Sequence, residues 1–298
     1  MEWLLPGTGG NVVLCFLVSD LHGSVDRYRA LFSLVREERP GAVFLGGDLL
    51  PPYMVPWQSP EPGQDDFVGD FLVAGFEELR RDLGEDYPSV FLILGNDDLR
   101  VDEAAILDAE KSGTWSYLHL RRSDLNGFPV YGYAHVPPSP FLLKDWERYD
   151  VSRFVDPGAV SPEEGRRSVA REQREIRNTT IKDDLERMVG EDSLERAIML
   201  FHSPPYKTNL DRAALDGREV DHVPVDVHVG SIAIQRFIEG RQPLITLHGH
   251  VHESARLTGS WRDQIGRTHL FSAAHDGPEL ALVRFDPGRP EEATRGLY

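Results

Sequence analysis

The sequence is poor in cysteine, in long apolar runs and in basic residues. Cys15 is the one cysteine among 298 residues, which excludes an internal disulfide. The longest apolar run, VVLCFLV, falls far short of the ~20 residues that span a bilayer. The first ten residues, MEWLLPGTGG, show neither a basic start nor a cleavage pattern. Together these absences predict a soluble cytoplasmic protein that does not associate with membranes.

The shortage of positive charge bears on possible partners. Lysine and arginine number 32 against 49 aspartates and glutamates, which gives a formal net charge of −17. Broad binding of DNA or RNA needs a basic surface, so nucleic acid is not an expected partner. A small phosphate-bearing substrate remains compatible with this charge, because bound divalent cations would invert the charge locally.

The first hundred residues alternate between apolar runs and helical patterns. Apolar runs within 11–18, 42–50 and 89–98 predict buried strands, and the patterns of 24–41 and 65–84 predict helices between them. This β–α–β–α–β order implies parallel strands joined by crossover helices. Each strand is followed by polar residues, at the carboxyl edge where open α/β sheets bind ligands.

The rest of the chain predicts a second group of strands. An Asn-Gly turn within 114–136 predicts a hairpin, and 162–190 reads as one charged surface helix. Further strands are predicted at 197–206, 243–253, 268–276 and 279–286, with a short helix at 230–242. Without repeats or a clear boundary, we expect a single domain over 1–298 that contains two half-sheets.

Successive strand ends carry carboxylate, amide or imidazole side chains. They are Asp20 with His22, Asp48, Asn96 with Asp97, His202, and His250 with His252. Each alone is a common turn residue or a structural histidine. Together they would place oxygen and nitrogen donors on one sheet edge, a mixture that suits manganese, iron or zinc.

Three histidines alternate in the stretch TLHGHVHES, residues 246–254. If the stretch is extended, His248, His250 and His252 lie on one face, and clustered imidazoles are typical of metal ligands. The alternative is a polar strand end that faces water. His248 precedes the other motif residues, so we expect it to support the ligands or to belong to the core.

The order of the motifs, Asp-x-His, Gly-Asp, Gly-Asn-Asp, His and Gly-His-x-His, resembles the calcineurin-like metallophosphoesterase superfamily over about residues 11–253. The runs HVGS, QPL and GHVHES are also similar to a little-characterised prokaryotic branch of it. The resemblance implies an α/β fold, a four-layer α/β/β/α sandwich with a two-metal site. It implies one metal bound by Asp20, His22 and His252, another bound by Asn96, His202 and His250, and Asp48 as the bridge.

The cofactors that the resemblance implies are two divalent cations, with manganese first and iron, zinc or nickel as alternatives. Such a pair clamps a phosphoryl group and lowers the pKa of a bridging water, giving a metal-bridging hydroxide near neutral pH. The function predicted is a dinuclear metal-dependent phosphohydrolase acting on a small phosphate ester, either a phosphodiester or an activated phosphate. The alternatives are a nuclease acting on nucleic acid ends and a non-catalytic scaffold on the same fold. A homo-oligomer stays open.

The Gly-Asn-Asp motif departs from the Gly-Asn-His common among members that hydrolyse monoesters. Asp97 stands where that histidine could protonate the leaving alkoxide. Nearby cations would depress the pKa of Asp97, and an ionised carboxylate is a poor general acid at neutral pH. Catalysis should therefore depend on good leaving groups, or the proton should come from another residue. The candidates are His222 and His228, for which the alternative is a surface loop.

Two further features leave alternatives open. Asp98 either supports the ligands or caps the N-terminus of a helix. The proline-rich segment 51–64, with Tyr53 and Trp57, either lines the substrate pocket or packs against the domain or a partner subunit.

Overall fold

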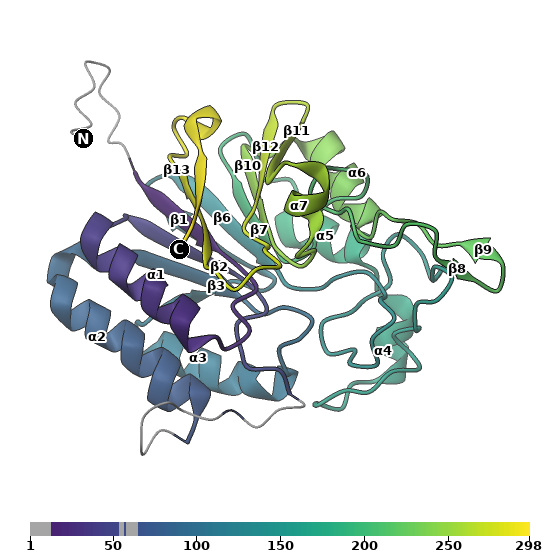
Figure 1. The fold of residues 1–298 in the computed structure, drawn as a ribbon, viewed down its shortest axis with the longest axis horizontal. Helices are drawn as coiled ribbons and strands as arrows, with labels where there is room; N and C mark the ends of the chain where they lie inside the picture. The colour runs from purple at the N-terminus through teal and green to yellow at the C-terminus, as the bar shows by residue number, and fades with distance from the viewer. Residues whose placement is uncertain (1–12, 54–56, 58–64) are drawn as a thin grey trace.

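The computed structural model describes residues 13–53, 57 and 65–298, and it contains two six-stranded mixed sheets (Figure 1). The first sheet has the order β14-β13-β1-β2-β3-β4, and the second has the order β11-β12-β10-β7-β6-β5. Strands of the first sheet are β1 (Cys15–Val18), β2 (Ala42–Gly46), β3 (Ser89–Ile93), β4 (Ser116–Tyr117), β13 (Ala281–Phe285) and β14 (Thr294–Leu297). Strands of the second are β5 (Arg121–Leu125), β6 (Phe128–Tyr133), β7 (Ile198–Phe201), β10 (Ile245–His248), β11 (Arg262–Ile265) and β12 (Thr268–Ser272).

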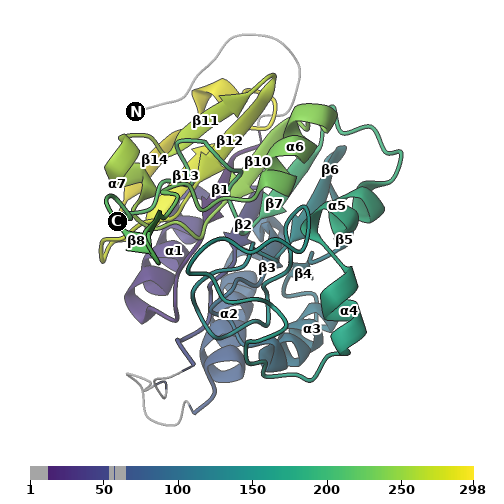
Figure 2. The same ribbon diagram turned by 90° about the vertical axis from the view of Figure 1, so that its right-hand side faces the viewer.

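Helices cover the outer face of each sheet. The first sheet carries α1 (Val25–Glu38), α2 (Ala74–Leu83) and α3 (Glu103–Lys111), with a π-helical turn at Phe67–Val73 leading into α2. The second sheet carries α5 (Ile181–Val189) and α6 (Ile232–Arg241), while the short α4 (Gln173–Asn178) and α7 (Ser254–Thr258) lie at its margins. Figures 1 and 2 place these two groups of helices on opposite sides of the paired sheets. The predicted four-layer α/β/β/α sandwich is confirmed.

Side-chain alternation along β7 shows how the layers are joined. Ile198 and Leu200 belong to the core that includes the first sheet, whereas Met199 and Phe201 pack with α5 and α6. Successive side chains of a strand point to opposite faces, so a fully apolar strand fits between two layers. The apolar runs of the sequence are therefore the strands that are buried on both faces.

The first helix forms where the sequence predicts it. Ser24 caps α1 by accepting a hydrogen bond from the backbone N–H of Arg27, at 3.4 Å. Tyr28, Leu31 and Val35 recur at helical spacing and are buried. The helix thereby holds the loop between β1 and α1 in place, and that loop carries two of the polar residues singled out above.

Parallel pairing brings the predicted strand ends to one edge. The strands β1, β2 and β3 pair in parallel in the first sheet, and β6, β7 and β10 do so in the second. Their carboxyl ends therefore point the same way within each sheet. Residues that follow these strands meet across the interface between the two sheets, as the distances below establish.

Two predicted elements differ from the structure. The helix expected over 162–190 is confined to α4 and α5, because the preceding backbone bonds to distant segments: the Arg166 N–H donates to the Leu142 carbonyl at 2.7 Å and that of Ser168 to the Asp145 carboxylate at 3.0 Å. The strand expected over 243–253 ends at His248, so His248, His250 and His252 do not share one strand face.

The predicted hairpin has an additional strand before it. The strands β5 and β6 pair around Asn126 and Gly127, whose positive φ angles of 50° and 83° fit the tight turn. The short strand β4 belongs to the first sheet, so the chain crosses between sheets just before the hairpin. A separate small hairpin, β8 (Glu219–Val220) and β9 (Val223–Pro224), projects at the right-hand edge of Figure 1.

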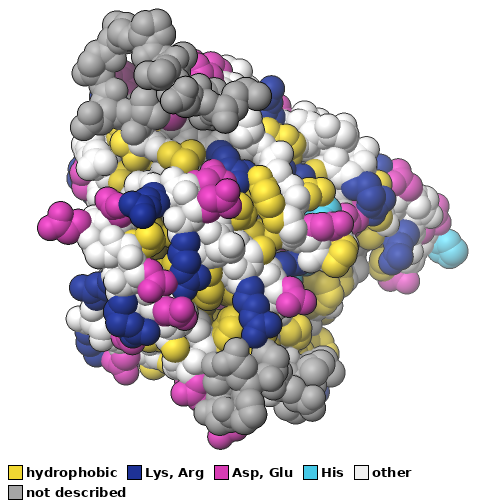
Figure 3. All heavy atoms as spheres, turned by 60° about the vertical axis from the view of Figure 1, so that its left-hand side comes forward, with side chains coloured by type: hydrophobic (Ala, Val, Ile, Leu, Met, Phe, Trp, Pro, Cys, Tyr) yellow, Lys and Arg dark blue, Asp and Glu magenta, His cyan; other side chains and the backbone are white. Residues whose placement is uncertain are grey.

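None of the helices formed by the described residues combines the length and the apolar character needed to cross a membrane. On the face in Figure 3, acidic and basic side chains are interspersed among apolar ones.

Candidate metal centre

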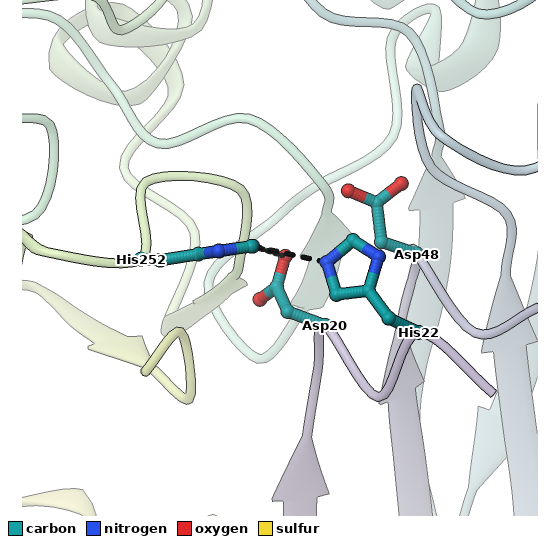
Figure 4. Close-up of side chains that lie close together, drawn as sticks. All are labelled: Asp20, His22, Asp48 and His252. Atoms are coloured by element: carbon teal, nitrogen blue, oxygen red, sulfur yellow. Dashed lines mark hydrogen bonds and ion pairs between the residues drawn. The ribbon is translucent and has the colours of Figure 1, made fainter. Parts of the chain in front are cut away.

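Four of the predicted ligands form one compact group. One ligand atom from each lies within 4.8 Å of the others, and the group consists of Asp20, His22, Asp48 and His252 (Figure 4). Asp20 and His22 follow β1, Asp48 follows β2, and His252 lies in the loop after β10. The group therefore joins the carboxyl edges of both sheets.

A second group shares a member with the first. Ligand atoms of Asp48, His202 and His250 also lie within 4.8 Å of one another. Asn96, which follows β3, places its amide oxygen 3.0 Å from His202 Nε2. All the predicted ligands are thus brought together, and Asp48 is the residue common to both groups.

Several of these residues adopt a left-handed backbone. The φ angle is 58° at Asp20, 46° at His22, 52° at Asp48 and 75° at His250. Residues with a side chain seldom adopt this conformation, and they tend to do so at functional sites. Hydrogen bonds between the two loops hold it, since the Asp20 N–H donates to the Gly47 carbonyl at 2.9 Å and the His22 N–H to the Asp48 carbonyl at 2.8 Å.

Close approach of backbone to side chain requires glycine at two places. A Cβ at Gly95 would overlap the carboxylate and backbone of Asp48, and a Cβ at Gly249 would overlap the hydroxyl of Ser19. Either methyl group would displace a loop of the centre. The glycines of the Gly-Asn-Asp and Gly-His-x-His motifs are therefore required by packing.

The hydrogen bonds of His202 orient it as a ligand. Its Nδ1 lies 2.8 Å from the Gly46 carbonyl, which can only accept, so Nδ1 carries a proton and Nε2 is the nitrogen that would bind a cation once its own proton has left. Nε2 lies 3.0 Å from the amide oxygen of Asn96 and 3.2 Å from Asp48 Oδ2. The Asn96 amide is itself oriented, because its nitrogen donates to Asp97 Oδ1 at 2.9 Å. Three acceptors that converge in this way fit a cation.

A similar convergence occurs around Asp20. His22 Nε2 and His252 Nε2 lie 3.1 Å apart, and His252 Nε2 is 3.2 Å from Asp20 Oδ1. The carboxylate of Asp20 is held by the hydroxyl of Ser19 and by the backbone N–H of His250. Imidazole nitrogens and carboxylate oxygens at this spacing are the donors that borderline divalent metals take.

Charge coupling within the cluster shifts the pKa values of its histidines. Burial lowers the pKa of His202, but the Asp48 carboxylate outweighs burial and raises it to about 10. Burial also lowers the pKa of His252, and Asp20 outweighs it to give about 9. For His250, burial and the neighbouring His202 outweigh the Asp48 and Asp20 carboxylates and lower its pKa to about 3. Without metal, two of these imidazoles therefore hold protons in places that a cation would take.

The two carboxylates respond in the opposite sense. Burial raises the pKa of Asp20, but the hydrogen bond and charge of His252 outweigh it, so the pKa lies below its ordinary value. Burial also raises the pKa of Asp48, and His202 outweighs it in the same way. Both carboxylates are therefore ionised at neutral pH, as metal ligands must be.

Asp98 supports the centre and caps no helix. Its carboxylate accepts hydrogen bonds from the backbone N–H groups of Leu50 at 2.8 Å, Leu49 at 3.2 Å and Gly95 at 2.8 Å. The helix α3 begins later, at Glu103, so the N-cap alternative is wrong. Asp98 instead ties the loop after β2 to the loop after β3, and so holds Asp48 beside Asn96.

His248 is a core residue beside the centre. It is buried at the end of β10, where its ring stacks on Phe201 and its nitrogens bond the Ser203 carbonyl at 3.0 Å and the Thr246 hydroxyl at 2.7 Å. Because Ser203 directly follows the candidate ligand His202, this bond helps to fix the position of His202. This matches the expectation that His248 stands behind the ligands.

Asp97 lies at the open side of the centre. Its carboxylate is 3.8 Å from His22 Nδ1, and its side chain is 45% exposed. In the metal-free protein, burial and the Asp48 carboxylate raise the pKa of Asp97. Bound cations would act in the opposite direction, by favouring its ionised form.

The two remaining catalytic candidates have different environments. His222 is exposed in the turn of the β8–β9 hairpin, with a φ of 65°. His228 is partly buried, and its Nδ1 lies 2.7 Å from Asp211 Oδ1. The structure gives His228 a fixed orientation and leaves His222 at the tip of a projecting hairpin.

The segment 51–64 is described only in part. Trp57 packs its ring on Phe67 at 5.2 Å and Phe71 at 6.0 Å, which agrees with packing against the domain. Pro51 lies against Gly23, next to His22, and Tyr53 is exposed. The rest of this predicted pocket lining, residues 54–56 and 58–64, lies outside the described residues.

Sequence reasoning missed three supporting side chains. Arg27 Nη1 donates to the Asp20 carbonyl at 2.6 Å, and its Nη2 donates to the Gly277 carbonyl at 2.5 Å. The Ser19 hydroxyl donates to the carboxylate of the candidate ligand Asp20, and Asp211 bonds the candidate acid His228. Ser19 precedes a motif, so its position was a usable signal. Arg27 and Asp211 act through contacts distant in sequence, and no local pattern marks them.

Comparisons with known proteins agree with this geometry. The sequence profile of the calcineurin-like phosphoesterase family matches residues 15–254. No curated protein sequence matches the chain. One solved crystal structure aligns with 16% identity over 96% of this chain and 99% of its own, with a TM-score of 0.59. The crystal structure of TT1561 from Thermus thermophilus aligns with 15% identity over 96% of this chain and 99% of its own, with a TM-score of 0.52.

An archaeal phosphodiesterase aligns with 9% identity over 96% of this chain and 100% of its own, but its TM-score of 0.45 is too low to bear on function. At these identities the first two structures show a common fold. The family profile covers most of the chain, including every predicted ligand, and the chain belongs to the calcineurin-like phosphoesterase family.

Proposed function

We propose that this protein is a dinuclear metal-dependent phosphohydrolase that acts on a small phosphodiester or an activated phosphate. The observation that carries the proposal is the sharing of Asp48 between two groups of converging donors. A carboxylate common to two such groups is the arrangement that a pair of cations ~3.5–4 Å apart requires. Family membership supports phosphoester chemistry at this site.

The candidate ligands divide between two cations. One would be held by Asp20, His22 and His252, the other by Asn96, His202 and His250, and Asp48 would contact both. Two bound cations supply electrostatic stabilisation of a phosphoryl group and a water of lowered pKa. With nitrogen and oxygen donors and no thiolate, manganese is the first candidate, and iron, zinc and nickel follow.

Residues of this chain orient and hold the ligands. The Gly46 carbonyl fixes the tautomer of His202, and the side chain of Asp97 fixes the amide of Asn96. The Asp97 N–H donates to Asp48 Oδ1 at 2.8 Å, so the bridging carboxylate is oriented before any cation arrives. Such prior orientation lowers the cost of reorganisation during the reaction.

Two other functions are less well supported. A nuclease would need a basic surface for its substrate, whereas the chain has a net charge of −17 and the face in Figure 3 mixes both signs. A non-catalytic scaffold has no use for a complete set of converging donors. We therefore place both behind the phosphohydrolase.

The decisive experiment combines metal analysis with a substrate screen. Purified protein loaded with Mn²⁺ is expected to bind two ions per chain, and to hydrolyse members of a panel of cyclic nucleotides, dinucleotides, aryl diesters and monoesters. Chelation should abolish turnover, and Mn²⁺ should restore it. Two bound ions without turnover of any substrate would favour the scaffold, and metal-dependent cleavage confined to DNA or RNA would favour the nuclease.

A further inference from the structure

We propose that His228 donates the proton to the leaving group of the phosphoester, and that Asp211 is the positioning residue that holds His228 in the donating orientation. This proposal rests on the phosphohydrolase function proposed above. The Gly-Asn-Asp motif provides no histidine to donate this proton. The proposal therefore assigns the proton to a residue from the second half of the chain.

Asp211 is fixed from all sides. It is fully buried, and its carboxylate accepts hydrogen bonds from the backbone N–H groups of Lys207 at 2.9 Å, Thr208 at 3.0 Å and Gly230 at 3.1 Å. Its Oδ1 also lies 2.7 Å from His228 Nδ1. A buried carboxylate with this many backbone donors has little freedom to move, so it sets the position of the imidazole.

The contact with Asp211 determines which nitrogen of His228 is available. The carboxylate can only accept, so Nδ1 carries a proton and Nε2 is left to exchange one. The His228 side chain is 28% exposed and is bonded at Nδ1, so the proposal assigns the proton transfer to Nε2. An aspartate that orients a histidine and stabilises its imidazolium is a recurring arrangement in acid–base catalysis.

A second aspartate braces the same histidine through the backbone. The His228 N–H donates to Asp226 Oδ1 at 2.9 Å, and the Tyr206 hydroxyl donates to Asp226 Oδ2 at 2.6 Å. The ring of Tyr206 meets the His228 ring edge to face at 6.1 Å. The imidazole is therefore held at its backbone, at its Nδ1 and along its face.

The segment that carries His228 is tied to the residues that follow two candidate ligands. Pro204, two residues after His202, accepts a hydrogen bond from the Ser231 N–H at 2.9 Å. Glu253, next to His252, accepts one from the Ala214 N–H at 2.9 Å. Arg212 and His228 pair as an antiparallel bridge between these two attachments. The segment that carries His228 is therefore anchored beside the loops of two candidate ligands, and the proposal places its imidazole towards the leaving group.

The chemistry calls for such a donor. The oxygen of a water molecule forms a bond to phosphorus and loses a proton to solvent, while the phosphorus–oxygen bond to the leaving group breaks. The electron pair of that bond stays on the leaving oxygen, which takes the proton from Nε2 of the imidazolium. His228 becomes neutral, keeps its Nδ1–H hydrogen-bonded to Asp211, and regains a proton at Nε2 from solvent. This transfer matters most for a poor leaving group and little for a nitrophenolate.

The test uses two substrates that differ only in the leaving group. Methyl phenyl phosphate and methyl 4-nitrophenyl phosphate are assayed with Mn²⁺-loaded wild type, His228→Gln and Asp211→Asn. For both variants we expect kcat on the phenyl ester to fall about 10²-fold or more, the lower range for general acid catalysis, and on the nitrophenyl ester by no more than about threefold. His222→Gln, on the β8–β9 hairpin, should leave both substrates unaffected.

A second readout does not depend on turnover. In the metal-free protein, the ring ¹⁵N shifts of His228, assigned by comparison with His228→Gln, should report an Nδ1–H imidazole. Asp211→Asn should shift this signal towards the Nε2–H form, while circular dichroism confirms that the variant is folded. A purely structural pair would change this signal without changing the dependence on the leaving group.

Three results would overturn the proposal. They are equal losses on both substrates, unchanged turnover of the phenyl ester in His228→Gln, or an His228 signal that does not respond to Asp211→Asn. Wild type that turns over neither substrate nor any other phosphoester would instead contradict the phosphohydrolase function, and the role of His228 with it.

Discussion

The two halves of the candidate centre differ in how far water reaches them. In the outer half, Asp20, His22 and His252, the two histidine side chains are 20% and 33% exposed. In the inner half, Asn96, His202 and His250, the side chain of His202 is fully buried, and that of Asp48, which both halves share, is 2% exposed. We therefore expect a cation bound in the inner half to be the more enclosed of the two, and the outer half to be the side where substrate enters and metal exchanges.

The largest effect is expected from removing the residue that the two halves share. Asp48→Asn keeps the shape of the side chain but loses its charge. We expect both ions to be lost and activity to fall by at least ~10³-fold, the upper range for removal of a single electrostatic contributor. Metal content by mass spectrometry, alongside turnover, checks this. A variant that retained two ions would show that Asp48 does not bridge.

The next effect should separate the halves. His202→Ala removes a ligand from the enclosed half, and His252→Ala removes one from the exposed half. We expect His202→Ala to abolish binding of the inner ion, and His252→Ala to weaken the outer ion by at least the ~10–100-fold seen when supporting groups are removed. Titration with Mn²⁺ followed by calorimetry resolves the two sites. Equal effects on both sites would mean that the halves act as one.

A smaller effect is expected at the support behind the inner half. Asp98→Asn presents an N–H group to backbone N–H donors, because an amide has only one acceptor atom. We expect the loss of about 1–3 kcal/mol of stability that follows an unsatisfied buried group. Metal affinity should weaken mainly at the inner site. Denaturant unfolding of the metal-free and Mn²⁺-loaded variant measures both effects, and an unchanged variant would contradict the assigned role of Asp98.

A further prediction concerns the protons held by two histidines of the centre. The folded-state pKa values of about 10 for His202 and about 9 for His252 lie above the ordinary 6.5, so both histidines stabilise the metal-free protein at low pH. That contribution is complete below the unfolded value and is lost as pH rises through the folded values. The Tm of metal-free protein should therefore fall from neutral pH towards pH 10.

The same protons offer a direct check on metal binding. Since a cation replaces them, Mn²⁺ binding near pH 7.5 should release protons, as metal binding at protonated ligands does. Calorimetry in buffers of different ionisation enthalpy counts the protons released. Binding with no release at this pH would show that His202 and His252 do not hold protons in the metal-free protein.

Much of the fold and the centre could be predicted because both follow from local patterns. Strands buried on both faces give continuous apolar runs, and their carboxyl ends are marked by abrupt changes to polar residues. Asp20, Asp48 and Asn96 could therefore be placed on one edge before any coordinates were known. The pattern predicted two half-sheets, and the four-layer arrangement followed from the family resemblance.

The parts that could not be predicted depend on contacts distant in sequence. The charged run 162–190 has helical composition throughout, but the backbone of Arg166 and Ser168 is bonded to a distant segment. The alternation of His248, His250 and His252 suggested a strand, whereas a φ of 75° at His250 ends it. Asp211 is recognisable only when its partner His228 lies beside it.

The position of β13 has a consequence for how the protein is made. This late strand pairs antiparallel with β1 and separates it from β14, while β1 pairs with β2 on its other side. During synthesis β1 must therefore wait with one edge open, a state prone to pairing with another chain. Asp20 and His22 also remain without their partner ligands at that stage, because His250 and His252 are synthesised more than half the chain later. The candidate ligand groups can therefore be complete only after most of the chain has been made, and the open edge of β1 is covered only when β13 arrives.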